Sequence, residues 1–458
     1  MVESDDKLGR IKHLLVTVFL SNVGTIIVTP AITDITMSAL CPAQDQCSLA
    51  IYLSGFQQAI IGVGSVIMMP LIGNLSDVYG RKAMLTLPMT VSIIPLVILA
   101  YSRERNYFYA YFVFRTLTAM VADGSVQCLA LAYVADNISE GKRCAAIGVL
   151  SGVGSSAYLG GTLVARFLSA AQASQASAFI SILATVYMRI FLKESLHQND
   201  AITQPILKNG VENYQCDEES SSKIKEFKKI PSPADFVFLI RSSPTFSLAA
   251  AVAFFQSFGD GGLASSLLYF LKARFHFSKD QFADLFLIGY LSSVVSQLLI
   301  MPLLVPLIGE EKLLSLGMLV GFLNMLVYSI AWSVWIPYAI AGLSMFVMFA
   351  SPCLRSLVSK QVGHSEQGMA QGCISGISSI ANIVSPVVFS PLTALFLSDK
   401  APFDFPGFSL LCIGLAHLIA FIPSAMVTAA TKISNSEVAN DDCPEANSEV
   451  ANNDCPEA

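Results

Sequence analysis

Twelve long apolar runs, separated mostly by short polar connections, dominate the sequence. A helix needs about 20 apolar residues to cross the hydrocarbon core of a bilayer, and the runs are close to that length or longer. Lipid offers the backbone no hydrogen-bonding partner, so a chain crosses it only as helices or as a closed barrel. The pattern predicts an all-α membrane protein with 12 transmembrane helices. The runs cover residues 12–35, 51–72, 83–101, 107–133, 144–168, 176–192, 245–270, 282–304, 313–331, 336–358, 369–397 and 407–429.

The composition supports lipid as the solvent for most of the chain. Only 13% of the residues are charged and the mean hydropathy is +0.61, whereas a soluble domain averages about 25% charged residues. The formal net charge of −6 comes from an acidic C-terminal tail, and the rest of the chain is close to neutral. Charge therefore gives no indication of a nucleic-acid partner. We expect no cleavable signal peptide, because the first apolar run is too long for one.

The distribution of Lys and Arg among the connections sets the orientation. With a cytoplasmic N-terminus, the inner segments hold seventeen of these residues and the outer loops hold six. Positive charge resists translocation, so both termini are predicted to be cytoplasmic. Plasma membrane and an endomembrane such as the vacuole are both compatible with this reading.

Two polar segments divide the chain into four parts. Residues 1–192 form an N-terminal six-helix bundle, 193–243 a cytoplasmic linker, and 244–431 a C-terminal six-helix bundle. Apolar positions three apart among lysines in the linker fit either a basic surface helix or a solvated segment. Residues 432–458 are predicted to be a disordered acidic tail with a tandem 12-residue duplication. In the first outer loop, Cys41 and Cys47 are either a disulfide or two free thiols.

The most informative connection is the short polar loop between the second and third runs. It reads Gly-Asn-Leu-Ser-Asp-Val-Tyr-Gly-Arg-Lys over residues 73–82. Glycine permits a tight reversal at the helix ends, which fits Gly73 and Gly80. Arg81 and Lys82 supply the cytoplasmic positive charge, and Asp77 is an acid without an evident role in a simple loop. After the eighth run the same spacing recurs, but Pro306 replaces the acid.

Several ionisable side chains lie at bilayer depth, where each costs at least about 2.5–3.5 kcal/mol and is expected to face a cavity or a partner. We interpret each as a part of a solute or proton pathway. The alternative for Arg115, Asp123 and Asp260 is a structural inter-helix ion pair, and for His417 it is a hydrogen bond to a neighbouring backbone carbonyl. Arg115 and Asp123 lie in span 4 about 80° apart around a straight helix, so a direct pair is not expected, whereas Asp123 and Gln127 share a face. A glycine cluster around Asp260 predicts local unwinding of span 7. The candidate pathway residues are Asn22, Arg115, Asp123, Gln127, Gln256, Asp260 and His417.

The loop at 73–82 resembles the signature between spans 2 and 3 of the major facilitator superfamily. Span 4 runs from Phe114-Arg115 to an Ala135-Asp136 exit, span 6 ends in Lys193-Glu194-Ser195, and span 11 is preceded by residues 362–372. These stretches resemble the tetracycline-resistance-type drug:proton antiporters, and most of all their hippocampus-abundant-transcript-like branch. The resemblance implies two matched six-helix bundles that alternate in access.

The resemblance also implies roles for the signature loop. Asp77 would accept hydrogen bonds from the N-terminus of span 11, where the helix dipole favours an anion. Arg81 would pair with Asp136, and both contacts would hold the cytoplasmic side closed. The antiporter motif of span 5 is only partly present between Gly152 and Gly161, without its Gly-Pro pair, so antiport, symport and uniport stay open.

These observations predict a secondary active transporter of a small organic solute. It is expected to work by alternating access and to be proton-coupled, with an intramembrane acid carrying the proton. The alternative is a non-transporting membrane scaffold or sensor, suggested by the altered second loop and the lost Gly-Pro. The chain lacks a phosphate-binding loop, which disfavours an ATP-driven pump. It also lacks a nucleophile elbow and a His/Cys/acid cluster with metal spacing, so we expect no enzyme. The expected partners are the lipid bilayer, a small-molecule substrate and a proton. We expect no cofactor, metal or nucleic acid, and a monomer.

Overall fold

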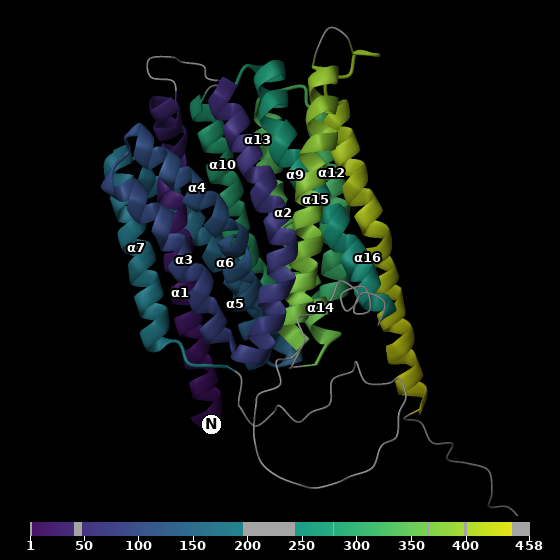
Figure 1. The fold of residues 1–458 in the computed structure, drawn as a ribbon. Coiled ribbons are helices and arrows are strands. Elements are labelled where there is room, and N and C mark those ends of the chain that lie inside the picture. The colour runs from purple at the N-terminus through teal and green to yellow at the C-terminus, as the bar shows by residue number, and fades with distance from the viewer. Residues whose placement is uncertain are drawn as a thin grey trace, which may run out of the picture.

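The computed structural model describes residues 2–40, 48–195, 243–277, 279–363, 366–397 and 401–441. These residues form helices that run side by side as one elongated bundle (Figure 1). The start of α1 and the end of α16 lie at the same end of the bundle (Figure 1), as predicted for termini on one side. The Lys and Arg distribution assigns this end to the cytoplasm, and it is called the cytoplasmic end below.

The first half of the chain forms the six predicted spans, one of which is divided into two helices. Helix α1 is long, and the connection from α2 to α3 is the single residue Gly80. The predicted fourth span consists of α4 and α5, which are separated by Asp123 and Gly124. The helices are α1 (Val2–Leu40), α2 (Ser48–Tyr79), α3 (Arg81–Tyr101), α4 (Arg105–Ala122), α5 (Ser125–Asn137), α6 (Glu140–Ala165) and α7 (Ala170–Phe191).

The second half forms the other six predicted spans, and the eighth and tenth spans of the chain are irregular. The eighth contains one π-helical turn, and the tenth contains a 3₁₀ turn. Such turns occur where the regular ladder is interrupted. The elements are α9 (Pro244–Phe275), α10 (Lys279–Val295), η1 (Ser296–Ile300), α11 (Met301–Ile308), α12 (Glu310–Ser329), α13 (Trp335–Leu343), η2 (Ser344–Phe346), α14 (Ala350–Lys360), α15 (Gln367–Phe396) and α16 (Phe408–Asp441).

Eleven stretches of the described residues are long and apolar enough to cross a membrane. Helix α9 is the twelfth predicted span; it has the length but is less apolar, because it carries polar and glycine residues in its middle. It packs between α15 and α16, where protein replaces lipid around much of its surface. The helix is continuous through Gly259-Asp260-Gly261, so the predicted unwinding at Asp260 was wrong. Packing against neighbouring helices keeps the glycine stretch helical.

Helix α16 extends further than the sequence suggested. Its backbone is helical to Asp441, so the predicted start of a disordered tail at 432 lies inside the helix. Extending a formed helix by a few residues is far easier than nucleating a new one. The duplicated residues after Asp441, the proposed linker helix and the Cys41–Cys47 pair lie outside the described residues.

Each half has an apolar core of its own. One core cluster gathers buried side chains of the first half, including Leu14, Tyr133 and Met188. Another gathers side chains of the second half, including Phe277 and Leu410. Because each of these two clusters draws its members from one half, the halves can be rearranged without dismantling either core.

Between the halves, α2 packs on α15 and α6 packs on α10 and α14. Glycines allow the closest approach: an added Cβ at Gly73 would overlap the backbone of Gly368, and one at Gly372 would lie 2.7 Å from the Met69 carbonyl oxygen. The contact between the halves is therefore tight at the cytoplasmic ends of α2 and α15.

Candidate functional site

The cytoplasmic contact between α2 and α15 is built around the Asp77 carboxylate. The backbone N–H groups of Gly368 and Met369 donate to Asp77 Oδ1 and Oδ2 at 3.0 and 2.8 Å. Both donors belong to the first turn of α15, where N–H groups have no partner within the helix. The carboxylate thus satisfies two helix donors and the positive end of the helix dipole. This is the contact that the resemblance implied for Asp77.

Arg81 fixes this carboxylate from within the first half. Its side chain is 1% exposed and lies 2.5 Å from Asp77 Oδ1 through Nη2. Its Nε donates to Asp136 Oδ2 at 2.8 Å, and its Nη1 donates to Ser76 Oγ. A buried guanidinium between two carboxylates is compensated in charge. The implied Arg81–Asp136 contact is therefore present, and the six residues named for the signature loop lie together around it.

Glu194 is a further member of the cluster around Arg81, and no role was predicted for it from the sequence. Its carboxylate accepts from the backbone N–H of Arg81 at 2.7 Å and from that of Lys82 at 3.1 Å. It therefore binds the start of α3 as Asp77 binds the start of α15. Gly80 has φ 97°, and an added Cβ would lie 2.5 Å from Glu194 Oε2, so this position requires glycine. An acid far along the chain gives no local signal for this role.

The loop after α11 repeats this geometry in the second half. Gly309 has φ 88° and ψ 150°, against φ 97° and ψ 150° for Gly80. The next residue, Glu310, is buried and forms an ion pair with Lys360 at the end of α14. The replacement of the loop acid by Pro306 suggested a degenerate loop, but the turn and a charge pair are both kept.

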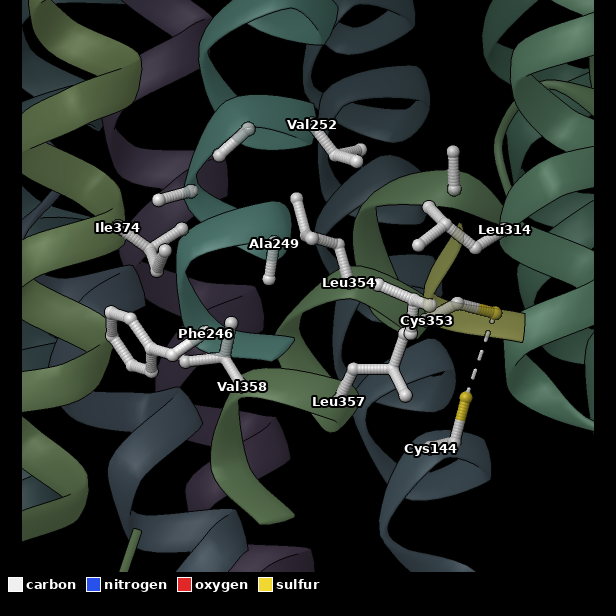
Figure 2. Close-up of a cluster of buried hydrophobic side chains, with 14 of the residues drawn as sticks. Cys144, Phe246, Ala249, Val252, Leu314, Cys353, Leu354, Leu357, Val358 and Ile374 are labelled. Carbon is white, nitrogen blue, oxygen red and sulfur yellow. Dashed lines mark hydrogen bonds between the residues drawn. The ribbon is translucent and has the colours of Figure 1, made fainter. Parts of the chain in front are cut away.

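A second contact between the halves joins α6 to α14. The Arg143 side chain is 2% exposed, and it donates to the carbonyl oxygens of Ala135 at 3.0 Å and Ser359 at 3.1 Å. Beside it, Cys144 and Cys353 place their sulfur atoms 3.7 Å apart at the edge of an apolar cluster of the second half (Figure 2). Both thiols are free. The cytoplasmic ends of the halves are thus joined at two places.

Within the bundle, Arg115 and Asp123 form a bidentate ion pair, with Nη1–Oδ1 at 3.0 Å and Nη2–Oδ2 at 3.1 Å. The prediction that they do not pair was wrong, because it assumed a straight span. Asp123 has extended backbone angles and Gly124 is left-handed at φ 79°, so the chain turns and re-aims the carboxylate. The same break removes the helix face that Asp123 and Gln127 were predicted to share.

The Arg115–Asp123 pair has further polar neighbours that the sequence did not single out. Gln57 of α2 donates through Nε2 to Thr116 Oγ1 at 3.0 Å and to the Phe112 carbonyl at 3.3 Å. This links α2 to the turn of α4 that carries Arg115. The pair itself is partly exposed, at 27% for Arg115 and 40% for Asp123.

Asp260 of α9 and His417 of α16 come together in the second half. His417 Nε2 lies 3.5 Å from Asp260 Oδ1, and His417 Nδ1 lies 3.2 Å from the Ile413 carbonyl oxygen. His417 is 3% exposed and Asp260 is 55% exposed. The backbone hydrogen bond expected as the alternative for His417 is present, and the other nitrogen of the ring faces the Asp260 carboxylate.

The candidate amides form no hydrogen bond with either of these two pairs among the described residues. Asn22 of α1 faces α6, where an added Cβ on Gly154 would lie 3.3 Å from its Nδ2. Gln127 is partly buried on α5. Gln256 of α9 is 9% exposed, and its Oε1 has no hydrogen-bond partner among the described residues. The structure does not gather these three side chains into one site.

The sequence analysis did not identify one partly buried cation of the membrane region. Arg355 of α14 donates through Nη1 to the Gln371 carbonyl at 3.0 Å and to Ser375 Oγ at 2.9 Å, while Gln371 Nε2 donates back to the Arg355 carbonyl. These bonds join α14 to α15 within the second half. Arg355 lies close to the end of the predicted tenth span, and its neighbours Leu354 and Ser356 do not indicate that its side chain contacts another helix.

A model of the Major Facilitator Superfamily matches residues 14–386. The chain therefore belongs to the Major Facilitator Superfamily, a family of membrane transporters, and is a multi-pass integral membrane protein.

Within this superfamily the relatives are those of the tetracycline-resistance and hippocampus-abundant-transcript type. The chain is 22% identical to the Hippocampus abundant transcript 1 protein of Mus musculus over 348 residues, which are 75% of this chain and 66% of that protein. The match thus spans just under two thirds of that relative. The chain is 23% identical to the class G tetracycline resistance protein of Vibrio anguillarum over 340 residues, 71% of this chain and 77% of that protein.

The fold is also that of solved transporters. The crystal structure of the human organic anion transporter MFSD10 (TETRAN) superposes with a TM-score of 0.74 at 18% identity, covering 91% of this chain and 99% of that one. At this level of identity the likeness establishes the fold alone.

Proposed function

We propose that this chain is a transporter and not an enzyme: a proton-coupled secondary carrier of a small organic solute that works by alternating access. Asp260 and His417 carry the proton, and the Arg115–Asp123 pair presents charge to the solute. The observation that supports this assignment most directly is the hydrogen bonding of His417.

A carbonyl oxygen can only accept a hydrogen bond, so His417 Nδ1 carries the hydrogen that it shares with Ile413. In a neutral imidazole, Nε2 is then an acceptor, and it faces a carboxylate oxygen 3.5 Å away. Two acceptors facing each other repel unless a proton lies on one of them. The pair therefore binds one proton in this arrangement, and loss of that proton favours separation of Asp260 from His417.

In this proposal the charged side chains of the membrane region face a water-filled path and not lipid. Asp260 is 55% exposed and Asp123 is 40% exposed, and both lie in transmembrane segments, where contact of an ion with hydrocarbon is costly. Exposure to a water-filled path between the halves removes that cost. Such a path gives the proton and the solute access to the same region.

The closed cytoplasmic end supports the alternating part of the proposal. The contacts of Asp77 with α15 and of Arg143 with α14 cross between the halves, while each half keeps a separate apolar core. Few polar contacts therefore have to break for the cytoplasmic side to open. We assign the signature-loop residues to this gate.

The test is a transport screen in liposomes with an imposed pH gradient, using organic cations, organic anions and neutral solutes. We expect the gradient to drive flux of one class. Asp260→Asn and His417→Gln should abolish the dependence on the gradient, and Asp404→Asn, an exposed acid at the opposite end from the gate, should not. Gradient-driven flux that survives Asp260→Asn would refute the proton assignment.

The scaffold alternative makes the opposite prediction, namely no flux of any solute by the folded protein. Its main motivation was the altered loop of the second half, and the Glu310–Lys360 pair weakens that motivation. The name of one relative refers to tetracycline resistance, and a solved transporter of the same fold is an organic anion transporter. Those substrates belong to the relatives, and both classes are included in the screen as candidates.

A further inference from the structure

The two halves repeat one turn but place opposite charges after it. Gly80 and Gly309 share the same unusual backbone conformation, and each directly precedes a helix. The first residue of the helix is Arg81 in one half and Glu310 in the other. Both side chains are buried, at 1% and 4% exposed. The two loops are therefore equivalent in geometry and opposite in sign.

The partners of these two residues also carry opposite charges. Arg81 pairs with Asp136 near the end of α5, and Glu310 pairs with Lys360 at the end of α14. In each half, the helix that follows the glycine turn is thus tied to the cytoplasmic end of another helix of the same half. The second pair is the first with cation and anion interchanged.

Arg143 lies between the two pairs. Its hydrogen bonds reach the carbonyl of Ala135 in the first half, next to Asp136, and the carbonyl of Ser359 in the second half, next to Lys360. The acids whose charges act on its guanidinium are Glu140 of its own helix, Asp136 and Glu310. A cation at position 310, as at position 81, would face Arg143 as a like charge in a buried region, where repulsion is poorly screened. The interchange of signs gives Arg143 an acid on each side.

We propose that these side chains form one chain of alternating charges across the cytoplasmic end, and that Arg143 couples the gate contacts of the two halves so that they open together. Alternation lets the buried charges compensate one another, whereas removal of one member leaves a neighbour unpaired. The proposal rests on movement of the halves but not on a particular solute or ion. In order, the chain is Asp77, Arg81, Asp136, Arg143, Glu310 and Lys360.

Hydrogen exchange measures this coupling without a substrate. The N–H groups of Gly368 and Met369 bond to Asp77 across the interface, and they exchange when the gate opens. Coupling predicts that Lys360→Gln and Arg143→Gln speed their exchange by at least about tenfold.

Two internal controls accompany these variants. The exposed neighbour Lys142→Gln makes the same change of charge and should have no effect. The N–H groups of Arg81 and Lys82, bound within one half by Glu194, should keep their rates.

A charge swap separates the coupled chain from two independent pairs. Glu310→Lys combined with Lys360→Glu restores an ion pair but places a lysine at 310 against Arg143. Coupling predicts that the swapped protein still exchanges fast at Gly368 and Met369, and that adding Arg143→Gln slows it again. Independent pairs predict full rescue by the swap alone, and that result would overturn the proposal.

The measurement stays decisive if a reversal impairs folding. Thermal unfolding and a single chromatographic peak identify folded variants, and Glu310→Gln and Arg143→Lys are milder versions of the same changes. Arg143→Lys keeps the charge but loses the two-pronged contact with both carbonyls, so its exchange should lie between wild type and Arg143→Gln. Wild-type exchange in every folded variant would also overturn the coupling. Failure of proton-driven flux would leave these exchange rates unaffected, so the two proposals fail separately.

Discussion

Replacing Asp77 by Asn tests the gate most directly. Asp77 accepts two hydrogen bonds from the start of α15 and also pairs with Arg81. The pair with Arg81 lies within one half and persists when the halves separate, so only the two bonds to α15 bias the opening. Asn keeps one acceptor oxygen and loses the charge. Since a hydrogen bond to a charged group contributes about 1.5–3 kcal/mol and a neutral one about 1, replacing two charged bonds by one neutral bond should cost the closed state about 2–5 kcal/mol.

That loss raises the equilibrium constant for opening by about 30- to 4,000-fold. The assay is alkylation of Cys144 and Cys353 by N-ethylmaleimide, followed by mass spectrometry. Both thiols are at most 1% exposed in the closed arrangement, so their reaction rate is proportional to the population of the open state. They lie at the other contact between the halves, so the substitution leaves their local surroundings unchanged.

The control for this prediction is Asp404→Asn, which removes the same charge from an exposed position. Alkylation should be accelerated by Asp77→Asn and unchanged by Asp404→Asn. Equal rates for Asp77→Asn and wild type, in folded protein, would refute the reasoning that the α2–α15 contact holds the cytoplasmic side closed.

Two further predictions concern the same interface. Gly73→Ala places a methyl group against the Gly368 backbone and should accelerate alkylation by forcing α2 and α15 apart. Gly160→Ala, with no atom within 4 Å of its added Cβ, should leave the alkylation rate unchanged. Equal effects of the two substitutions would contradict the packing argument. The Cys144 and Cys353 sulfur atoms, 3.7 Å apart, should form a disulfide with copper phenanthroline that stops flux until it is reduced, and Cys353→Ser should abolish this sensitivity; full flux in the cross-linked protein would show that the halves need not separate there.

The candidate site was only partly predictable from sequence, for reasons that differ between residues. Asp77, Arg81 and Asp136 carried a recognisable motif, and the contacts implied for them are present. Glu194 had no such signal, because its role depends on the position of the end of α7 beside the start of α3. A capping acid is identified from sequence only when it lies next to the helix that it caps.

The Arg115–Asp123 pair was not predicted, because span 4 was assumed to be one unbroken helix. Periodicity assigns faces correctly only along an unbroken helix. The left-handed Gly124 ends that regularity within an apolar run, where glycine is common in transmembrane segments and its conformation cannot be read. The pairing of the two side chains followed from one backbone turn.

The sequence by itself indicated that lipid surrounds most of the chain, and it predicted the number of spans, their division into two sets and the side on which the termini lie, because burial in lipid and positive charge act on each segment separately. The tertiary structure alone decided which charges meet, including Asp260 with His417 and Glu310 with Lys360. Each of these pairs joins side chains of different helices far apart in the chain. Their distance depends on helix packing, rotation and breaks, for which no single segment carries the information.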